Sequence, residues 1–182
     1  ATERVAVVKF SSSTAKQSSE GDCKITQAPA AYFVESFLTS MGKFTINDVT
    51  LPEGSSYVWK HDAERGYMKA SSFVGGTESW LISPEIDLTK IKEASLNFDH
   101  AMNFIGSDNA SDHIFVYVKK VGADWTQITV PNYPTSATKW NFVNSGDFDL
   151  KNFVGSKIQI GFKYVGTTSV APTYELKNVL IK

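Results

Sequence analysis

The sequence predicts an all-β protein built as an antiparallel β-sandwich or jelly roll. In KIQIGFKYV at 157–165, Ile158, Ile160, Phe162 and Tyr164 alternate with lysine, glutamine and glycine, which is the two-residue repeat of a half-buried strand. Many similar short runs follow one another, separated by loops rich in Gly, Ser, Asn and Asp. No long amphipathic helix pattern interrupts them. Roughly nine or ten strands of this kind are typical of a sandwich or jelly roll.

The N-terminal part divides into a strand, a polar stretch and a boundary near residue 30. Residues 4–10 predict a strand, and the small polar residues that follow have the composition of a linker. We therefore predict an N-terminal strand and linker at 1–31 and one domain at 32–182. A short helix through 31–41 is one interpretation of the next stretch, but its aromatic and β-branched residues favour an extended chain in part of it.

The middle of the chain predicts a long loop and then a bent strand. Residues 47–66 are loop-like, 67–73 predict a strand, and a Gly-Gly pair turns the chain into WLISPEIDL at 80–88. Pro84 lies inside this otherwise strand-like run, so we expect a bend or an edge position there. We assign Trp80 to the core.

The C-terminal half continues the same alternation. In the run 94–103 the side chains Ala94, Leu96, Phe98, His100 and Met102 share one face. The strand at 113–121 is bulky on both faces, which predicts a central strand covered on both sides. Further strands are expected at 125–131 and 173–182, and in the last one Leu176, Asn178 and Leu180 should share a face.

Composition excludes several classes of protein. The 182 residues suffice for one domain, and a net charge of −1 gives no field that would hold nucleic acid or an anionic membrane. Cys23 is the only cysteine, so neither an intrachain disulfide nor a Cys/His zinc site is expected. No apolar run is long enough for membrane insertion, and the start lacks the features of a signal peptide. An abrupt start at Ala1 before a strand favours an excised or processed fragment.

Catalytic motifs are missing from the sequence. It contains no nucleophile elbow, no H-E-x-x-H and no phosphate-binding glycine loop. Asp99 and His100 are neighbours on a strand and point to opposite faces, so they cannot act as a catalytic pair, and His100 is expected to be a hydrogen-bonded core residue. The alternative is a glycoside hydrolase that uses two carboxylates from separate strands, with Glu78, Glu85 and Glu175 as the candidates.

A glycan site needs aromatic planes beside hydrogen-bonding side chains. The loops 47–66, 103–112 and 131–139 could present such planes at one end of a sandwich. The competing interpretation for each tryptophan is burial in the core, because such rings are highly buried on average. The candidate ligand-binding residues are Trp59, Asp62, Trp125, Asn132, Tyr133 and Trp140.

The order of short motifs resembles one known family. ESF at 35–37, ESWLISPEIDL at 78–88, LNFDH at 96–100, FVGSKIQIGFKY at 153–164 and ELKNVLI at 175–181 follow one another as in the cleaved adhesin and choice-of-anchor J domains. Those domains are jelly rolls similar to MAM and galactose-binding-like domains. The resemblance covers about residues 32–182.

This resemblance implies a non-catalytic module of a secreted or surface-anchored bacterial protein, located outside the cell or on its surface. Its partner would be a glycan or a host or matrix protein, and the module would belong to a larger multidomain chain. A purely structural spacer is a further alternative.

The resemblance also implies a structural calcium ion, for which hard oxygen ligands are required. Glu35, Asp99, Asp112 and Asn178 are the candidate ligands, with Glu35 and Asn178 best supported. The family usually carries an acidic residue where this sequence has Lys177.

Overall fold

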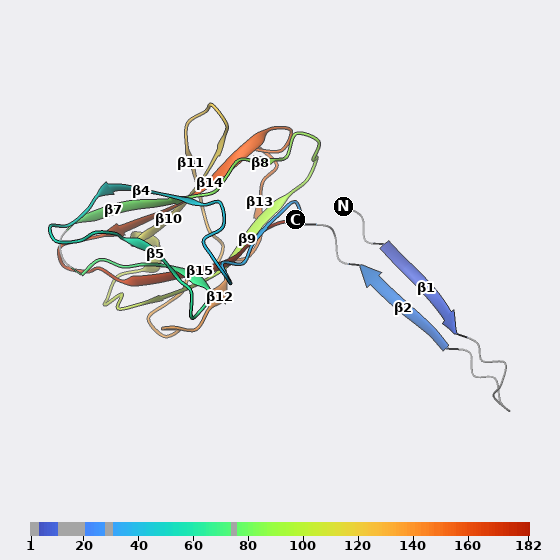
Figure 1. The fold of residues 1–182 in the computed structure, drawn as a ribbon, viewed down its shortest axis with the longest axis horizontal. Coiled ribbons are helices and arrows are strands. Elements are labelled where there is room, and N and C mark those ends of the chain that lie inside the picture. Colours follow the sequence, from blue (N-terminus) through green and yellow to red (C-terminus); the bar gives the residue numbers. More distant parts are fainter. Residues whose placement is uncertain (1–3, 11–20, 28–30, 74–75) are drawn as a thin grey trace.

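The computed structural model describes the backbone of residues 4–10 and 21–27 and the complete residues 31–73 and 76–182. It confirms the all-β prediction: two antiparallel sheets stack face to face in a sandwich (Figure 1). Of the predicted polar linker, residues 11–20 lie outside the described residues, and its last two residues, 21 and 22, belong to a strand. In the part of the chain that the structure describes, no helix combines the length and apolarity needed to cross a bilayer.

The first sheet, here called the β14 sheet, has β14 near its centre and the order β11-β10-β14-β7-β4, with the short β8 also paired to β14. All its strand pairs are antiparallel. Its strands are β4 (Thr45–Thr50), β7 (Thr77–Ile82), β8 (Ile86–Asp87), β10 (Ile114–Lys120), β11 (Thr126–Ile128) and β14 (Lys157–Gly166).

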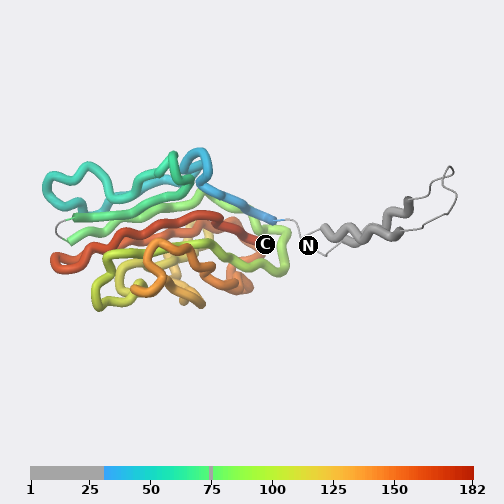
Figure 2. Tube along the Cα trace, turned by 90° about the horizontal axis from the view of Figure 1, so that it is seen from below, coloured from blue at the N-terminus to red at the C-terminus, as the bar shows by residue number. Residues whose placement is uncertain are grey.

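The second sheet, here called the β15 sheet, has the order β12-β9-β15-β6-β5, with β13 paired to β9 and β3 paired to β15. Figure 2 views the molecule from the side of this sheet, where β15 crosses the middle of the face. Its strands are β3 (Phe33–Glu35), β5 (Trp59–Asp62), β6 (Tyr67–Ala70), β9 (Ser95–Asn103), β12 (Val143–Asn144), β13 (Phe148–Asp149) and β15 (Thr173–Ile181).

The core fills the space between the two sheets, as the alternation predicts. Ile158, Ile160 and Phe162 of β14 are fully buried, and so are Leu96 and Met102 of β9. The rings of Phe98 and Phe162 join the sheets, with centroids 5.1 Å apart in an edge-to-face arrangement. The strand assignments that rest on a clear two-residue repeat are therefore confirmed.

Several strands lie where the sequence predicted loops or another structure. The stretch 31–41 contains the strand β3 and turns, so the extended interpretation is confirmed over the helical one. The predicted loop 47–66 contains the end of β4 and all of β5. In the N-terminal part, β1 (Arg4–Phe10) pairs with β2 (Gly21–Gln27), and this second strand was not predicted.

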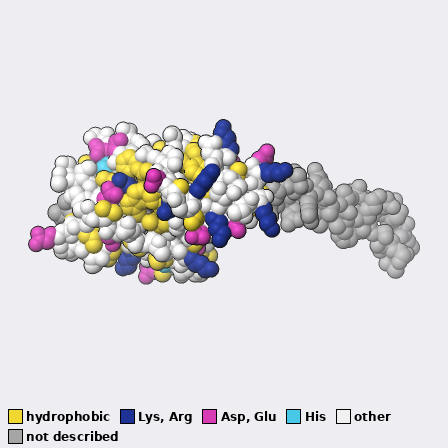
Figure 3. Space-filling view, turned by 90° about the horizontal axis from the view of Figure 1, so that it is seen from above, with side chains coloured by type: hydrophobic (Ala, Val, Ile, Leu, Met, Phe, Trp, Pro, Cys, Tyr) yellow, Lys and Arg dark blue, Asp and Glu magenta, His cyan; other side chains and the backbone are white. Residues whose placement is uncertain are grey.

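The outer face of the β14 sheet carries an aromatic cluster instead of a covering layer. Trp80 contacts both Tyr117 and Trp125 there, with ring centroids 4.8 Å apart for Trp80 and Tyr117 and 5.6 Å apart for Trp80 and Trp125. All three are half-buried. Figure 3, which views the molecule from this side, shows hydrophobic side chains gathered among charged ones. The predictions that Trp80 lies in the core and that β10 is covered on both sides are therefore wrong.

Gly161 allows this cluster to lie close to the sheet. It sits on β14 directly below the two indoles, where the β-carbon of any other residue would meet Trp80 at 3.0 Å and Trp125 at 3.2 Å. The glycine therefore lets the rings rest on the backbone itself. Lys119 adds a cation–π contact, with its ammonium 4.6 Å from the Trp125 ring centroid.

The last strand breaks its own alternation at a bulge. The pairing of β15 with β9 shifts register between Lys177 and Leu180, and Asn178 adopts the left-handed backbone conformation with φ 53°. Leu176 faces the core before the bulge, and Val179 and Ile181 face it afterwards. The prediction that Leu176, Asn178 and Leu180 share one face is therefore wrong.

Candidate functional site

A groove lined by aromatic rings lies on the outer face of the β15 sheet. Its central hollow has a volume of about 720 Å³, with Tyr67, Lys69 and Glu175 among its lining residues. A hollow of about 310 Å³ adjoins it and shares Tyr57 and Lys69, and one of about 360 Å³ adjoins it through Ser71, Phe73 and Thr173. We call these three hollows together the aromatic groove.

Strand geometry places the floor of the groove. On β6 the side chains of Met68 and Ala70 are buried in the core, so the residues between and before them, Tyr67 and Lys69, point outward. Glu175 lies directly opposite Lys69 in the β6–β15 pairing and also points outward. Phe142 packs on Tyr67 with ring centroids 5.8 Å apart and so forms one wall.

Exposed aromatic rings form the rest of the walls. Phe73 is 94% exposed, Phe104 67% and Trp140 44%. The rings of Phe104 and Trp140 meet edge to face with centroids 5.5 Å apart. Exposed rings gathered around one hollow are a feature of ligand-binding surfaces, because single exposed apolar residues are common whereas contiguous ones are not.

Two charged side chains of the groove pair with each other, and a third is hydrogen-bonded to a tyrosine. Arg65 forms an ion pair with Asp62 at 3.1 Å. The Tyr67 hydroxyl donates a hydrogen bond to the Glu175 carboxylate. Burial raises the pKa of Glu175, and the opposing effects of the Tyr67 hydroxyl, Lys69 and Arg65 do not cancel it.

A buried histidine anchors the segment that carries Trp140 and Phe142. His100 is fully buried, and its Nε2 donates to the Asn132 carbonyl at 2.9 Å while Nδ1 accepts from the Tyr174 hydroxyl at 3.2 Å. Tyr133 packs on the imidazole with ring centroids 5.9 Å apart. The predicted hydrogen-bonded core role of His100 is confirmed, and through it the wall of the groove is tied to β9.

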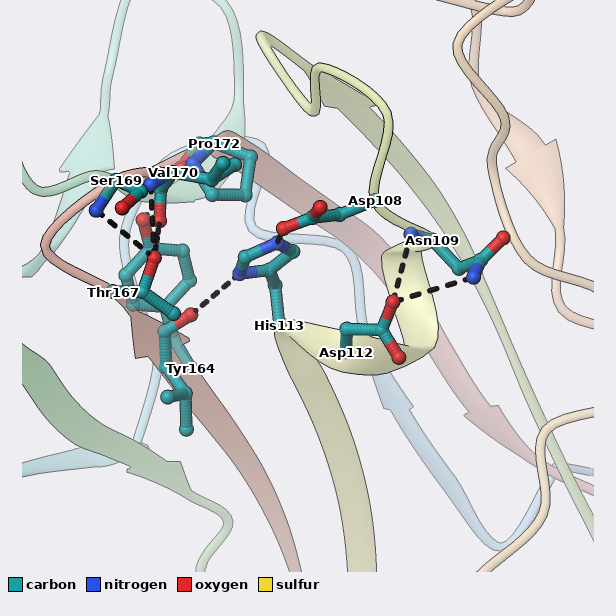
Figure 4. A network of polar contacts seen from close by, with 10 residues as sticks. Asp108, Asn109, Asp112, His113, Tyr164, Thr167, Ser169, Val170 and Pro172 are labelled. Carbon is teal, nitrogen blue, oxygen red and sulfur yellow. Dashed lines mark hydrogen bonds and ion pairs between the residues drawn. The ribbon is translucent and has the colours of Figure 1, made fainter.

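A second buried histidine fixes the loop that carries Phe104. In Figure 4, His113 lies between Asp108 and the end of β14: Nε2 is 3.0 Å from the Asp108 carboxylate, and Nδ1 donates to the Val165 carbonyl at 3.0 Å. The same picture shows the Thr167 hydroxyl held within its own turn, near Ser169 and Val170. Both loops that close this end of the groove are therefore held by specific hydrogen bonds.

The predicted ligand-binding residues are divided among different parts of the molecule. Trp140 and Asp62 line the groove. Trp125 lies on the opposite face of the sandwich, so it cannot contact a ligand together with Trp140. Asn132 and Tyr133 support the wall through His100.

Trp59 takes no part in the surface of the groove. It is 1% exposed and packs edge to face on Tyr174, with centroids 5.9 Å apart. Its ring therefore presents no face to a ligand. Trp59 is a core tryptophan, which was the competing interpretation.

The three carboxylates suggested for glycoside hydrolysis do not face one another. Glu78 lies on the outer face of the β14 sheet, where it bonds Lys163 at 2.9 Å and accepts from the Trp80 indole. Glu175 lies on the outer face of the other sheet. Glu85 is exposed and lies 3.8 Å from Lys157. No two of these three can flank one glycosidic bond.

The four side chains predicted to hold calcium all form hydrogen bonds to protein groups, and Glu35 pairs with Val179, next to Asn178. Asp99 accepts from the Asn178 side-chain amide at 2.8 Å. Glu35 accepts from the Phe37 backbone, and Asp112 accepts from Asn109. Within 31–73 and 76–182, no three His, Cys, Asp or Glu side chains are grouped as a metal site requires. Calcium binding by the predicted residues stays a prediction.

We expect calcium to leave the stability of the protein unchanged. A bound ion would raise the melting temperature by mass action, but these carboxylates already accept hydrogen bonds from the protein. Thermal unfolding in excess calcium and in EDTA should give the same midpoint. A rise that depends on calcium concentration would contradict this expectation and support the ion that the resemblance implies.

Sequence reasoning missed most of the groove. Tyr67 and Phe73 were placed on a strand without a functional role, Glu175 was considered only as a carboxylate for glycoside hydrolysis, and Phe142 was not singled out. The available signal was weak: Tyr67 and Lys69 are at outward-facing positions of one strand, and Glu175 is at an outward-facing position of another. Only the pairing of β6 with β15, separated by about a hundred residues of sequence, brings them together.

Among the comparisons with known proteins, the one with solved structures supports the fold. No protein-family model matches the chain, and no curated protein sequence matches it either. Among solved structures, the architecture is that of small jelly-roll domains of the binding-module and adhesin type. The similarity to each is below 25% identity and therefore establishes the fold alone.

Three of these structures show the extent of the likeness. The carbohydrate-binding module TmCBM61, in complex with β-1,4-galactotriose, has a TM-score of 0.57 at 10% identity, covering 85% of this chain and 99% of the other. The K1 cleaved adhesin domain of Lys-gingipain from Porphyromonas gingivalis has a TM-score of 0.56 at 21% identity, covering 82% and 96%. The K2 cleaved adhesin domain of Lys-gingipain has a TM-score of 0.56 at 14% identity, covering 82% and 97%. The chain thus has the fold that its motifs predicted.

Proposed function

We propose that this chain is a non-catalytic carbohydrate-binding module that holds a glycan along the aromatic groove. The observation that carries the proposal is the gathering of Phe73, Phe104 and Trp140, all exposed, beside the polar floor formed by Lys69 and Glu175. Sugar rings present apolar faces to aromatic planes and hydroxyl edges to polar groups, and the groove offers both.

The shape of the groove supports a glycan chain over a single sugar. From Tyr67 to Phe73 the chain runs over a span of up to about 20 Å at the usual rise per residue of a strand. The three hollows adjoin along this direction. A ligand that extends through several sugar units would fill all three, and we expect affinity to rise with oligosaccharide length.

The location and context of the module are part of the same proposal. We place it in a secreted or surface-anchored bacterial protein, because its motifs resemble adhesin domains and a solved neighbour is a cleaved adhesin domain from Porphyromonas gingivalis. A host or matrix protein as partner is the alternative for the same groove. Within a larger chain, several modules would add avidity to modest single-site affinity.

Replacing Trp140 with alanine should lower glycan affinity by roughly tenfold or more, because truncation of a central aromatic contact typically costs over about 1 to 2 kcal/mol. Affinity electrophoresis in gels cast with galactan, xylan, β-glucan or mannan measures the change as loss of retardation. Trp125→Ala makes the same truncation on the opposite face and should leave retardation intact. Retardation lost with Trp125→Ala and kept with Trp140→Ala would place the site on the β14 sheet instead.

A further inference from the structure

The floor of the aromatic groove holds a carboxylate that no cation bonds directly. Glu175 is 5% exposed, and among the described residues no ion pair within 4.0 Å includes it. Tyr67 donates one hydrogen bond to it. A carboxylate offers about four acceptor positions, so capacity remains on the side that lines the central hollow. Burying a carboxylate without a paired cation costs free energy. Such groups are often found where the side chain contacts a ligand.

The formal charges that line the central hollow and the adjoining hollow at its Tyr57 end, Glu175 included, sum to zero. These two hollows are lined by three basic side chains and three acidic ones. The basic residues are Lys60, Arg65 and Lys69, and the acidic residues are Asp62, Glu64 and Glu175. Arg65 is already paired with Asp62 at 3.1 Å, and Lys69 faces Glu175 across the strand pair. The side chains that line these two hollows therefore carry no net positive charge, and the nearby Lys177 ammonium is stacked on the Phe142 ring, 3.9 Å from its centroid.

The other end of the groove contains hydroxyls and aromatic rings without any charge. Its lining combines Phe73 and Phe104 with the hydroxyl residues Ser71, Thr167 and Ser169. Hydroxyl groups both donate and accept hydrogen bonds, which suits a ligand that also carries hydroxyls. The lining of the groove therefore has no net formal charge, and its most buried charged group, Glu175, is a hydrogen-bond acceptor.

We propose that the aromatic groove selects neutral, hydroxyl-rich saccharides over acidic ones, and that Glu175 sets this preference. The inference rests on the proposed function and names the ligand class of the same site. The Glu175 carboxylate accepts hydrogen bonds from sugar hydroxyls on the ring that lies over Tyr67. A uronic acid or sulfate group placed there meets a like charge in a partly desolvated hollow, where repulsion is stronger than in water.

The test uses matched ligands that differ only in charge. The probes are cello-oligosaccharides, galacto-oligosaccharides and manno-oligosaccharides of four units, each also prepared with the C6 hydroxyls oxidised to carboxylates. Isothermal titration gives the ratio of dissociation constants, oxidised over neutral, for the wild type and for Glu175→Gln. The glutamine keeps the shape and one acceptor but removes the charge. Glu85→Gln removes an exposed carboxylate far from the groove and is the control.

For the wild type we expect the dissociation constant of the oxidised ligand to exceed that of the neutral one by roughly tenfold or more. This ratio should fall toward one in Glu175→Gln and stay unchanged in Glu85→Gln. Because the substitution removes a buried charge, Glu175→Gln should melt no lower than the wild type, and a melting curve checks that it is folded. Equal or tighter binding of oxidised ligands, or a ratio that Glu175→Gln leaves unchanged, would overturn the neutral preference while leaving glycan binding intact. Absence of binding to every probe, neutral and oxidised, would overturn the proposed function itself.

Discussion

Trp59→Ala is expected to lower the free energy of unfolding by about 3 to 5 kcal/mol, the range for removing a large aromatic side chain from a packed core. The indole is 1% exposed and packs edge to face on Tyr174 of β15. Its Nε1 donates to the Ser79 carbonyl at 3.3 Å, which connects β5 in one sheet to β7 in the other. The substitution therefore removes packing and a hydrogen bond between the two layers at once.

Urea unfolding measures this loss, provided that the dependence of the unfolding free energy on urea concentration is the same in both proteins. The melting temperature should fall by roughly 10 °C for a chain of this size. Trp140→Ala is the matched comparison, because the same atoms are removed from a ring that is 44% exposed. Its unfolding free energy should stay within about 1 kcal/mol of the wild type. The opposite pattern, with Trp59→Ala stable but unable to bind glycan, would restore the ligand role that the sequence suggested for Trp59.

The second large effect is a loss of stability in acid that originates at His100. Burial lowers the pKa of His100 from 6.5 to about 4, while the hydrogen bond to Asn132 and the nearby Asp99 act in the opposite direction. The unfolded chain thus binds this proton at a higher pH than the folded protein does. The stabilisation is complete above pH 6.5 and is lost as pH falls toward 4, amounting to about 3 kcal/mol over this window.

His100→Gln should flatten the pH dependence between pH 7 and pH 4, because glutamine can hydrogen-bond there without titrating. Chemical unfolding at a series of pH values gives the slope for both proteins, and their difference isolates His100 from the carboxyl groups. Glu175 contributes with the opposite sign, since its raised pKa makes the fold more stable as pH falls. An identical slope in wild type and His100→Gln would show that another group causes the acid sensitivity.

The effect of pH should also reach the groove. His100 holds the Asn132 carbonyl, and the segment that follows carries Trp140 and Phe142. A protonated imidazole keeps the bond to this carbonyl but loses its ability to accept from Tyr174. Acid would therefore first break the link from His100 to Tyr174 of β15, next to Glu175 on the groove floor, while the link to the wall is kept.

Much of the fold could be predicted because the two-residue repeat is visible in sequence. Ile158, Ile160 and Phe162 were assigned to one face, and that face is the core. The repeat does not reveal which face of a strand is covered by another layer. Trp80 and Trp59 were misplaced for this reason: the hydrophobic Trp80 lies on an outer face, and Trp59 is buried although the residues after it, 60–62, are polar.

The groove was less predictable because its parts come from distant segments. Trp140 could be proposed from its polar surroundings, and it does line the groove. Glu175 and Tyr67 meet through strand pairing, which local patterns do not encode. The neutral charge balance of the groove likewise depends on which side chains the fold brings together.

The bulge at Asn178 gives the two halves of β15 separate tasks. Residues Tyr174–Leu176 pair with β6 and carry the floor of the groove, whereas Val179–Ile181 pair with β3 and close the core. In a strand without a bulge, one continuous two-residue alternation would fix which side chains face outward and which face inward along its whole length. The extra residue separates the register of the two halves. Mutations that alter the ligand-facing residues before the bulge therefore need not shift the inward-facing residues after it. Evolution or design could thus change ligand specificity through residues before the bulge while the residues after it continue to pack in the core.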